Sequence, residues 1–252
     1  MATSFLAKFR AGTPVLGTMV MWVRTPGVIR MAAVAGLDYV VVDLQHSNLG
    51  FETVADMCEV ARAADIALFI RPSDMGQDTV NRLQDLGADG FMFHDVTSRA
   101  QLDELIRPLT YPPRGTRGIA IGGPGADYRP GVSAESLAAA DDRQLTIVQI
   151  ESQEGLDNLD SILGDGIDVV DVGRQDLSIS LGVPGQITHP RVEAAVDSVL
   201  KASAARGIAC ALAVANAEEA RRQLDRGARF LTYRTDKAII LDAYRSFSAA
   251  LS

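Results

Sequence analysis

The sequence predicts an α/β fold, a (β/α)8 TIM barrel, with residues 1–252 forming a single domain. Short apolar segments alternate with amphipathic segments along the chain, which is the pattern of a parallel sheet covered by helices. Eight such strand candidates occur in 252 residues, a number and length typical of this barrel. With 47% hydrophobic residues, the chain is long enough to bury one large core.

The predicted strands are short apolar runs rich in β-branched residues. They lie at residues 14–22, 39–45, 67–73, 90–96, 145–152, 167–173, 208–215 and 229–235. Amphipathic segments between them predict helices, several of which end at a capping glycine. These lie at 51–65, 77–87, 98–109, 156–163, 190–207 and 217–227. The connections 111–131 and 174–190 are longer than a barrel needs, and long ordered loops are usually functional.

Charge and composition exclude several classes of protein. The chain has 24 Lys and Arg against 32 Asp and Glu, a net charge of −8, which argues against nucleic acid and anionic lipid as partners. No run approaches the roughly 18 apolar residues that span a bilayer, and the first apolar run is too short for a signal peptide. We therefore expect a cytoplasmic protein. Cys58 and Cys210 lack a CxxC pattern and are expected to be packing residues.

Polar side chains occur at the ends of several predicted strands. In a TIM barrel the chemistry lies at the C-terminal ends of the strands, whereas the strand middles fill the core. The residues in these positions are Asp43, Gln45, His46, Arg71, His94, Asp95, Gln149, Glu151 and Asp171, with Asp176 following shortly after the sixth strand. We therefore expect the functional site at this end of the barrel.

Glu151 and Asp176 follow consecutive strands and are expected at the same part of the rim. Two carboxylates with open coordination positions suit a hard divalent cation such as Mg²⁺, which keeps waters or substrate oxygens as its other ligands. Taken singly, each acid is also compatible with a solvated loop, and Asp176 with the cap of a turn. The pair predicts a metal site.

Arg71 ends the third strand just before Pro72, which fixes the chain there and would direct the guanidinium over the barrel mouth. A planar guanidinium in that place suits a carboxylate substrate; the alternative is an internal salt bridge to a rim acid. His46 is a candidate proton-transfer group, with Asp43 orienting its ring and raising its basicity. His94 also ends a strand but lacks such a partner.

Lysine usage bears on the type of chemistry. A Schiff-base mechanism would need a desolvated lysine inside the barrel. The three lysines are Lys8 near the N-terminus, Lys201 in an amphipathic segment and Lys237 after the last strand. Only Lys237 is a candidate, so the residues favour a metal-dependent route.

Residues 149–190, QIESQEGLDNLDSILGDGIDVVDVGRQDLSISLGVPGQITHP, resemble the signature region of the HpcH/HpaI aldolase family, the metal-dependent class II pyruvate aldolases. The resemblance extends to DLQHS at 43–47, RPSD at 71–74 and YPPRGTRG at 111–118, and it covers nearly the whole chain. It implies a lyase that reversibly cleaves a 4-hydroxy-2-oxo acid into pyruvate, or a close 2-oxo acid, and an aldehyde. The reaction would pass through a metal-stabilised enolate.

The resemblance also implies roles for single residues. Glu151 and Asp176 would hold a divalent cation, Mg²⁺, Mn²⁺ or Co²⁺, that chelates the oxo acid. Arg71 would neutralise the developing enolate oxygen, where a fixed positive charge lowers the barrier most. His46, paired with Asp43, would take part in proton transfer.

Three further positions would complete this site. Gln149 would lie beside the metal site, and the backbone N–H groups of Gln175 and Asp176 would hold the substrate carboxylate. Family members commonly form hexamers in which the last helix packs on another subunit. The apolar segment 237–252 is compatible with such a homo-oligomer.

The chain departs from the usual family pattern at identifiable positions. Gln45 replaces a glutamate, and Arg174 and Gln175 replace a proline and a small residue before the metal aspartate. Arg174 would either add a cation to the oxo-acid pocket or fold away to the surface. Alternative functions are an oxaloacetate decarboxylase or an enolate-condensing synthase of the same family, and a non-catalytic sensor of oxo acids.

Overall fold

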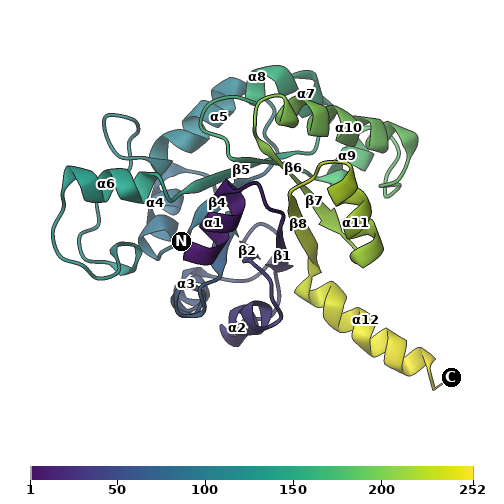
Figure 1. Ribbon diagram of the computed structural model, residues 1–252, viewed down its shortest axis with the longest axis horizontal. Coiled ribbons are helices and arrows are strands. Elements are labelled where there is room, and N and C mark those ends of the chain that lie inside the picture. Colours follow the sequence, from purple (N-terminus) through teal and green to yellow (C-terminus); the bar gives the residue numbers. More distant parts are fainter. Residues whose placement is uncertain (1, 252) are drawn as a thin grey trace.

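The computed structural model describes residues 2–251 and confirms the predicted barrel, in which eight parallel strands close in sequence order. The strands are β1 (Val15–Val20), β2 (Tyr39–Asp43), β3 (Ala67–Arg71), β4 (Gly90–Phe93), β5 (Leu145–Ile150), β6 (Val169–Val172), β7 (Ala209–Val214) and β8 (Phe230–Thr235). Each strand lies within the segment that the sequence predicts for it. The helices surround the barrel (Figure 1).

Helices connect the strands and flank both ends of the chain. They are α1 (Thr3–Arg10), α2 (Gly27–Val34), α3 (Phe51–Ala64), α4 (Gln77–Asp85), α5 (Arg99–Ile106), α6 (Ala134–Asp141), α7 (Gln153–Asp157), α8 (Leu159–Ile162), α9 (Arg174–Ser180), α10 (Pro190–Ala204), α11 (Ala217–Asp225) and α12 (Asp236–Ala249), with short 3-10 turns η1 (Arg107–Leu109) and η2 (Pro124–Ala126). Among residues 2–251, no helix is long and apolar enough to cross a membrane.

Two local predictions are wrong. The single helix expected at 156–163 is instead two short helices, α7 and α8, which meet at Asn158. The stretch 174–190, expected to be a loop, begins with helix α9. Burial of Leu177 explains this helix. The first helical turn of α9 places the Leu177 side chain in the hydrophobic core.

Aromatic side chains fill the end of the barrel where the strands begin. The ring of Phe5, from α1, packs edge-on against Tyr39, Phe69 and Phe230 at centroid distances of 5.4–6.3 Å. A Cβ atom at position 17 would lie 2.4 Å from the Tyr39 ring, so glycine at this position leaves room for the ring. Figure 1 shows α1 lying across this end of the barrel. These rings close the barrel interior at the end where the strands begin.

Candidate active site at the carboxyl ends of the strands

The inward-facing layer nearest the carboxyl ends of the strands is polar. Asp43 of β2 lies directly opposite Arg71 of β3, and Gln149 of β5 lies directly opposite Asp171 of β6. Side chains two residues apart on a strand share a face, so the layer beneath comprises the side chains two residues earlier. These are the buried apolar residues Val41, Phe69, Ile147 and Val169. The change from apolar to polar marks where the core ends and the site begins.

Asp43 and Arg71 form a two-point ion pair. Arg71 Nε donates to Asp43 Oδ1 at 2.9 Å, and Nη2 donates to Oδ2 at 2.8 Å. Both side chains are buried. Burial alone would lower the pKa of Arg71, but the hydrogen bonds and charge of Asp43 outweigh it and the pKa is raised. Arg71 is therefore a fixed, permanently charged guanidinium at the barrel mouth.

This pair gives Asp43 a partner that the sequence does not predict for it. Its carboxylate accepts from Arg71 and from the backbone N–H of Gln45, at 2.9 Å, whereas in residues 2–251 no hydrogen bond joins it to His46. The physical reason is the strand geometry: Asp43 faces the barrel interior, while His46 lies three residues later, exposed on the loop beyond β2. Asp43 thus orients Arg71, and its expected pairing with His46 stays a prediction.

Gln149 connects this pair to Asp171. Arg71 Nη1 donates to Gln149 Oε1 at 3.4 Å, and Gln149 Nε2 donates to Asp171 Oδ2 at 2.8 Å. Asp171 is buried, and burial raises its pKa to about 6 despite the Gln149 hydrogen bond and the charge of Arg71. The sequence places Asp171 at a strand end but assigns it no role; its alternation with Val169 is the signal that it faces the site.

The structure brings Glu151 and Asp176 to one side of the mouth, as expected. Glu151 is buried, and its Oε1 accepts from the Asp95 backbone N–H at 2.9 Å. Asp176 lies exposed in the first turn of α9. Burial, and then the charge of Asp176, raise the pKa of Glu151 to about 7. Two neighbouring carboxylates that repel in this way suit a cation between them.

The glycine at position 173 makes room for this arrangement. A Cβ there would lie 2.5 Å from Glu151 Oε2 and 3.2 Å from Gln149 Nε2. The backbone before α9 can therefore approach both site residues only because it carries no side chain. Within residues 2–251, no preformed group of three or more His, Cys, Asp or Glu residues is arranged for a metal. Two carboxylates with open positions fit a cation completed by waters and substrate oxygens.

Gln45 and His94 form a second contact that the sequence did not indicate. Gln45 Nε2 and His94 Nδ1 are 3.1 Å apart, which joins the end of β2 to the end of β4. Burial, and then the charge of Arg71, lower the pKa of His94. A neutral imidazole can accept a hydrogen bond from the carboxamide at Nδ1. The residue that departs from the usual family glutamate therefore has a defined partner.

Arg174 follows neither of its expected alternatives. Its guanidinium is buried and pairs with Glu219 at 2.8 Å, with a further hydrogen bond to the Ala213 carbonyl oxygen. It is therefore held against β7 and α11, and its charge is matched by Glu219. Gln175, one residue later, is exposed in the first turn of α9, where helix N–H groups have no intrahelical partner.

The lysines and cysteines lie away from this site. Lys8 pairs with Asp38 at 2.6 Å, and Lys201 and Lys237 are exposed on α10 and α12. None of the three is a desolvated amine inside the barrel, so the Schiff-base route has no nucleophile here. Cys58 and Cys210 are free and buried, which confirms that they are packing residues.

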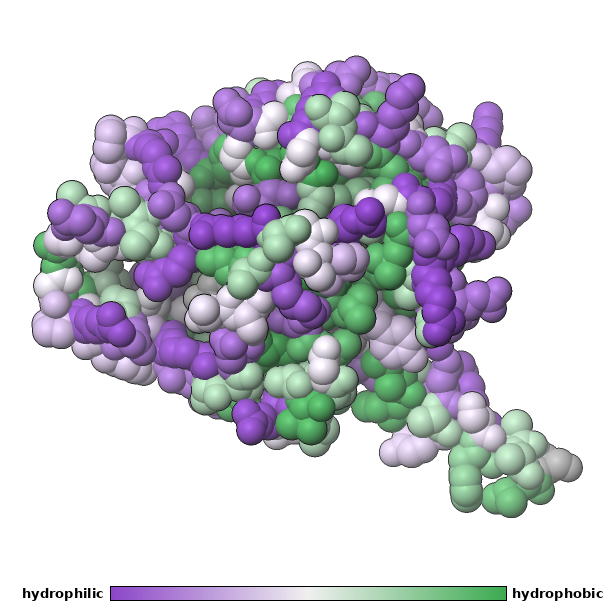
Figure 2. All heavy atoms as spheres, viewed as in Figure 1, coloured by the Kyte–Doolittle hydropathy of each residue, from purple (hydrophilic) through white to green (hydrophobic). Residues whose placement is uncertain are grey.

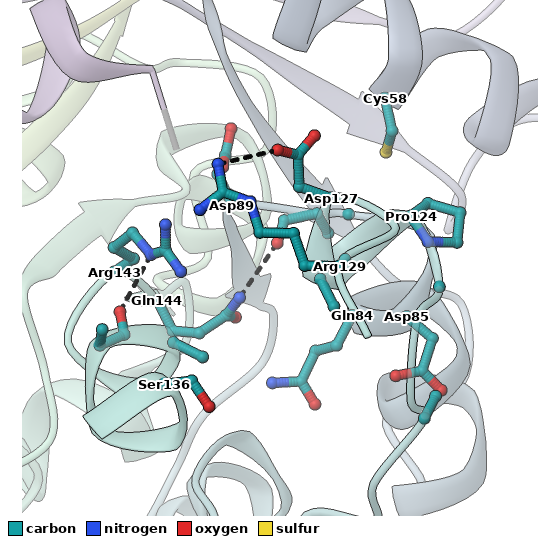
Figure 3. Close-up of a pocket in the computed structure, with 18 of the residues that line it drawn as sticks. Cys58, Gln84, Asp85, Asp89, Pro124, Asp127, Arg129, Ser136, Arg143 and Gln144 are labelled. Atoms are coloured by element: carbon teal, nitrogen blue, oxygen red, sulfur yellow. Dashed lines mark hydrogen bonds and ion pairs between the residues drawn. The ribbon is translucent and has the colours of Figure 1, made fainter. Parts of the chain in front are cut away.

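A polar cavity of about 560 Å³ lies at the other end of the barrel, beneath the 117–132 segment (Figure 3). Its lining includes Asp89 and Gln144, which precede β4 and β5. In Figure 3, Gln144 donates to a backbone carbonyl oxygen and Arg129 pairs with Asp127, at 3.0 and 3.3 Å. None of the site residues predicted from the sequence lines this cavity, so it is separate from the polar layer at the strand ends.

The family model for HpcH/HpaI aldolase/citrate lyase matches residues 18–243. The chain belongs to this family. Members of the family are generally metal-dependent. The match includes all of the polar layer and both carboxylates, so the resemblance inferred from the sequence motifs is confirmed.

Individual family members are similar over almost their whole length. The chain is 30% identical to a hydroxypyruvate/pyruvate aldolase from Pseudomonas aeruginosa, covering 97% of this chain and 91% of the relative. It is 29% identical to a 4-hydroxy-2-oxo-heptane-1,7-dioate aldolase from Escherichia coli, covering 99% and 95%. Among solved structures, an HpcH/HpaI aldolase from Desulfitobacterium hafniense superposes with a TM-score of 0.94 at 32% identity, covering 98% and 95%.

Proposed function

We propose that this protein is a class II pyruvate aldolase, a lyase that reversibly splits a 4-hydroxy-2-oxo acid into pyruvate, or a close 2-oxo acid, and an aldehyde. The observation that carries the proposal is the fixed Arg71 guanidinium in a mouth that also holds two neighbouring carboxylates, Glu151 and Asp176. The aldolase names of the similar proteins support the same reaction class.

Glu151 and Asp176 are the proposed ligands of a divalent cation, Mg²⁺, Mn²⁺ or Co²⁺. Their oxygen donors suit a hard cation, and a cation between them would offset the burial and the charge of Asp176 that raise the pKa of Glu151. Such an ion supplies Lewis-acid polarisation of the oxo acid's carbonyl group when it is bound.

Arg71 stabilises the negative charge that develops during cleavage. Breaking the bond between C3 and C4 of the substrate moves an electron pair towards the 2-oxo oxygen, while the 4-hydroxyl loses its proton and becomes the aldehyde carbonyl. A guanidinium already oriented by Asp43 can meet that oxygen without reorganising, which is the source of electrostatic catalysis. The cleaved fragment then takes a proton at C3 to give pyruvate.

His46 is the proposed proton-transfer group. It lies exposed at the mouth, beyond the end of β2, where a substrate hydroxyl can approach it. Asp43, whose carboxylate accepts from Arg71, is the residue proposed to be paired with His46 in this transfer. Gln149 lies beside Arg71 and is a proposed substrate contact, and the free N–H groups in the first turn of α9, at Gln175 and Asp176, are proposed to hold the substrate carboxylate.

The protein is also proposed to be a homo-oligomer, because α12 and the barrel wall expose apolar surface. α12 extends away from the barrel, and its end is apolar (Figures 1 and 2). Tyr244 and Phe247 on it are 70% and 71% exposed. The barrel itself exposes Leu16 on β1 and Met31 and Val34 on α2. Packing of α12 from a second copy on this face would bury both surfaces. Family hexamers are one such assembly. The cytoplasmic location of the protein is a separate prediction.

The test is consumption of pyruvate by purified protein in the presence of Mg²⁺ and a panel of aldehydes. We expect pyruvate to disappear only when an aldehyde is added, with a carbon–carbon bonded 4-hydroxy-2-oxo acid as the product. Turnover of oxaloacetate to pyruvate with no aldehyde-dependent reaction would assign the decarboxylase instead. The absence of both activities, with pyruvate still bound, would favour the sensor.

A further inference from the structure

We propose that Asp171 is a positioning residue that acts through the Gln149 carboxamide to hold Arg71 in its working orientation. The inference rests on the proposed aldolase function, because it assigns Arg71 to the substrate oxygen. Asp171 and Gln149 are directly opposite each other in the β5–β6 register, and both face the barrel interior. The hydrogen bonds between Asp171 and Arg71 run through Gln149, although the charges of Asp171 and Arg71 also attract each other.

The contacts form one buried series of hydrogen bonds that joins β2, β3, β5 and β6. Asp171 accepts from Gln149 at 2.8 Å, Gln149 accepts from Arg71 at 3.4 Å, and Arg71 donates twice to Asp43 at 2.9 and 2.8 Å. All four residues are at most 8% exposed. A carboxylate stands at each end of this hydrogen-bonded series, Asp43 at one and Asp171 at the other, so the Arg71 guanidinium is held from both sides.

The chemistry of a carboxamide explains why Asp171 matters to Arg71. The oxygen of Gln149 can accept only, and its NH2 group can donate only. An ionised carboxylate can only accept, so Asp171 requires the NH2 group of Gln149 to face β6. The carbonyl oxygen of Gln149 must then face Arg71. With an apolar residue at position 171, only Arg71 would favour this orientation of the amide, and the amide would be freer to turn.

This arrangement leaves Arg71 a defined donor for substrate. A guanidinium has five N–H donors. Asp43 accepts from Nε and Nη2, Gln149 accepts from Nη1, and the Met19 sulfur lies 3.9 Å from Nη2. One N–H of Nη1 has no contact of this kind within residues 2–251, so a turned Gln149 amide would change the geometry at the nitrogen that is left for substrate.

The position of Asp171 argues against a role in packing alone. The inward residue beneath it, Val169, is apolar and fully buried, and a buried carboxylate costs free energy unless its charge is used. Its raised pKa is consistent with that cost. The hydrogen bond from Gln149, together with the positive charges of Arg71 and Arg174, offsets part of that cost.

Three variants separate positioning from simple structural support. Asp171→Val removes the acceptor but keeps a β-branched residue in the strand. Asp171→Asn is the conservative control, because its amide oxygen can still accept from Gln149. Gln149→Ala removes the intermediary, and combining it with Asp171→Val closes a double-mutant cycle. Melting temperatures would confirm that each variant is folded.

We expect Asp171→Val to lower kcat for pyruvate turnover about tenfold or more, the effect of losing one hydrogen bond to a charged group, with little change in KM. Asp171→Asn should stay within about threefold of the unsubstituted protein, because the acceptor is retained. In the Gln149→Ala background, Asp171→Val should add less than about a twofold effect. An equal effect in both backgrounds would show that Asp171 does not act through Gln149 and would overturn the proposal.

A readout independent of turnover distinguishes failure of this inference from failure of the proposed function. The side-chain NH2 resonances of Gln149, identified by their absence in Gln149→Ala, should be protected from hydrogen exchange in the unsubstituted protein and in Asp171→Asn. Protection should be lost in Asp171→Val. If pyruvate turnover is absent but this pattern is found, the aldolase assignment fails and the positioning contact stands. If turnover is present but protection does not depend on residue 171, the inference is wrong.

Discussion

Asp43 and Arg71 lie opposite each other on adjacent strands and share two hydrogen bonds of 2.9 and 2.8 Å inside the barrel mouth. The pair converts a flexible side chain into a fixed positive charge next to two carboxylates. Asp43 is buried in this pair whereas His46 is exposed, so the two residues should respond differently to substitution.

Replacing Asp43 with Asn should destabilise the fold as well as reduce activity. Removing one partner of a buried ion pair costs about 3 kcal/mol, because the remaining charge is left unmatched. For a chain of this size that lowers the melting temperature by roughly 6–12 °C. His46→Asn, at an exposed position, should lower turnover while changing stability by less than about 0.5 kcal/mol. Thermal unfolding and turnover of the two variants check this; equal stability of both would contradict the assignment.

Gln45→Glu should raise the pKa of His94. Burial and Arg71 now lower that pKa, and the neighbouring carboxamide carries no charge to oppose them. A carboxylate in the same place stabilises the imidazolium, so the pKa should rise by at least about one pH unit. NMR titration of the histidine rings measures this, with His94→Asn assigning the resonance. An unchanged His94 titration would show that the two side chains do not contact each other.

Asp171→Asn should change how stability depends on pH. The folded chain holds the Asp171 proton up to a pKa of about 6, against an ordinary value of 3.8. The ionised carboxylate therefore destabilises the fold at neutral pH, by up to about 3 kcal/mol, and this penalty disappears as pH falls below about 4. Urea unfolding in EDTA should show the variant gaining stability relative to the unsubstituted protein between pH 4.5 and 7.5. A difference that is constant with pH would refute the buried, titrating carboxylate.

Charges on α12 should dissociate the proposed oligomer. Tyr244→Glu combined with Phe247→Glu places two carboxylates on the most exposed apolar part of the helix, and burying them against another copy would be unfavourable. Light scattering should report a smaller assembly. Val132→Glu, at a 44% exposed apolar residue elsewhere, is the matched control and should leave the assembly unchanged. An intact oligomer in the double variant would place the interface on another surface.

The sequence was sufficient for the barrel because alternating strand and helix patterns are local signals. Each of the eight strands falls inside its predicted segment. Helix α9 was missed because the seven residues Arg174–Ser180 are too short to show a helical period against a neighbouring loop rich in Gly and Pro.

The residue set at the strand ends could also be predicted, but not its pairing. Asp43 is three residues from His46 in sequence and 28 from Arg71, yet register places it against Arg71. The contacts Gln149–Asp171 and Gln45–His94 likewise join different strands. Strand alternation could have identified Asp171 as inward-facing; which neighbour it meets depends on the closed sheet.

We propose that a metal-dependent aldolase reaction takes place at Glu151, Asp176 and Arg71. Its most direct test is aldehyde-dependent pyruvate consumption by protein stripped with EDTA and then supplied with Mg²⁺, Mn²⁺ or Co²⁺, alongside Glu151→Gln. We expect chelation to abolish the reaction, a divalent cation to restore it, and Glu151→Gln not to regain it at the same cation concentration. Activity that survives chelation, or that Glu151→Gln retains in full, would rule out a metal-dependent reaction at this site.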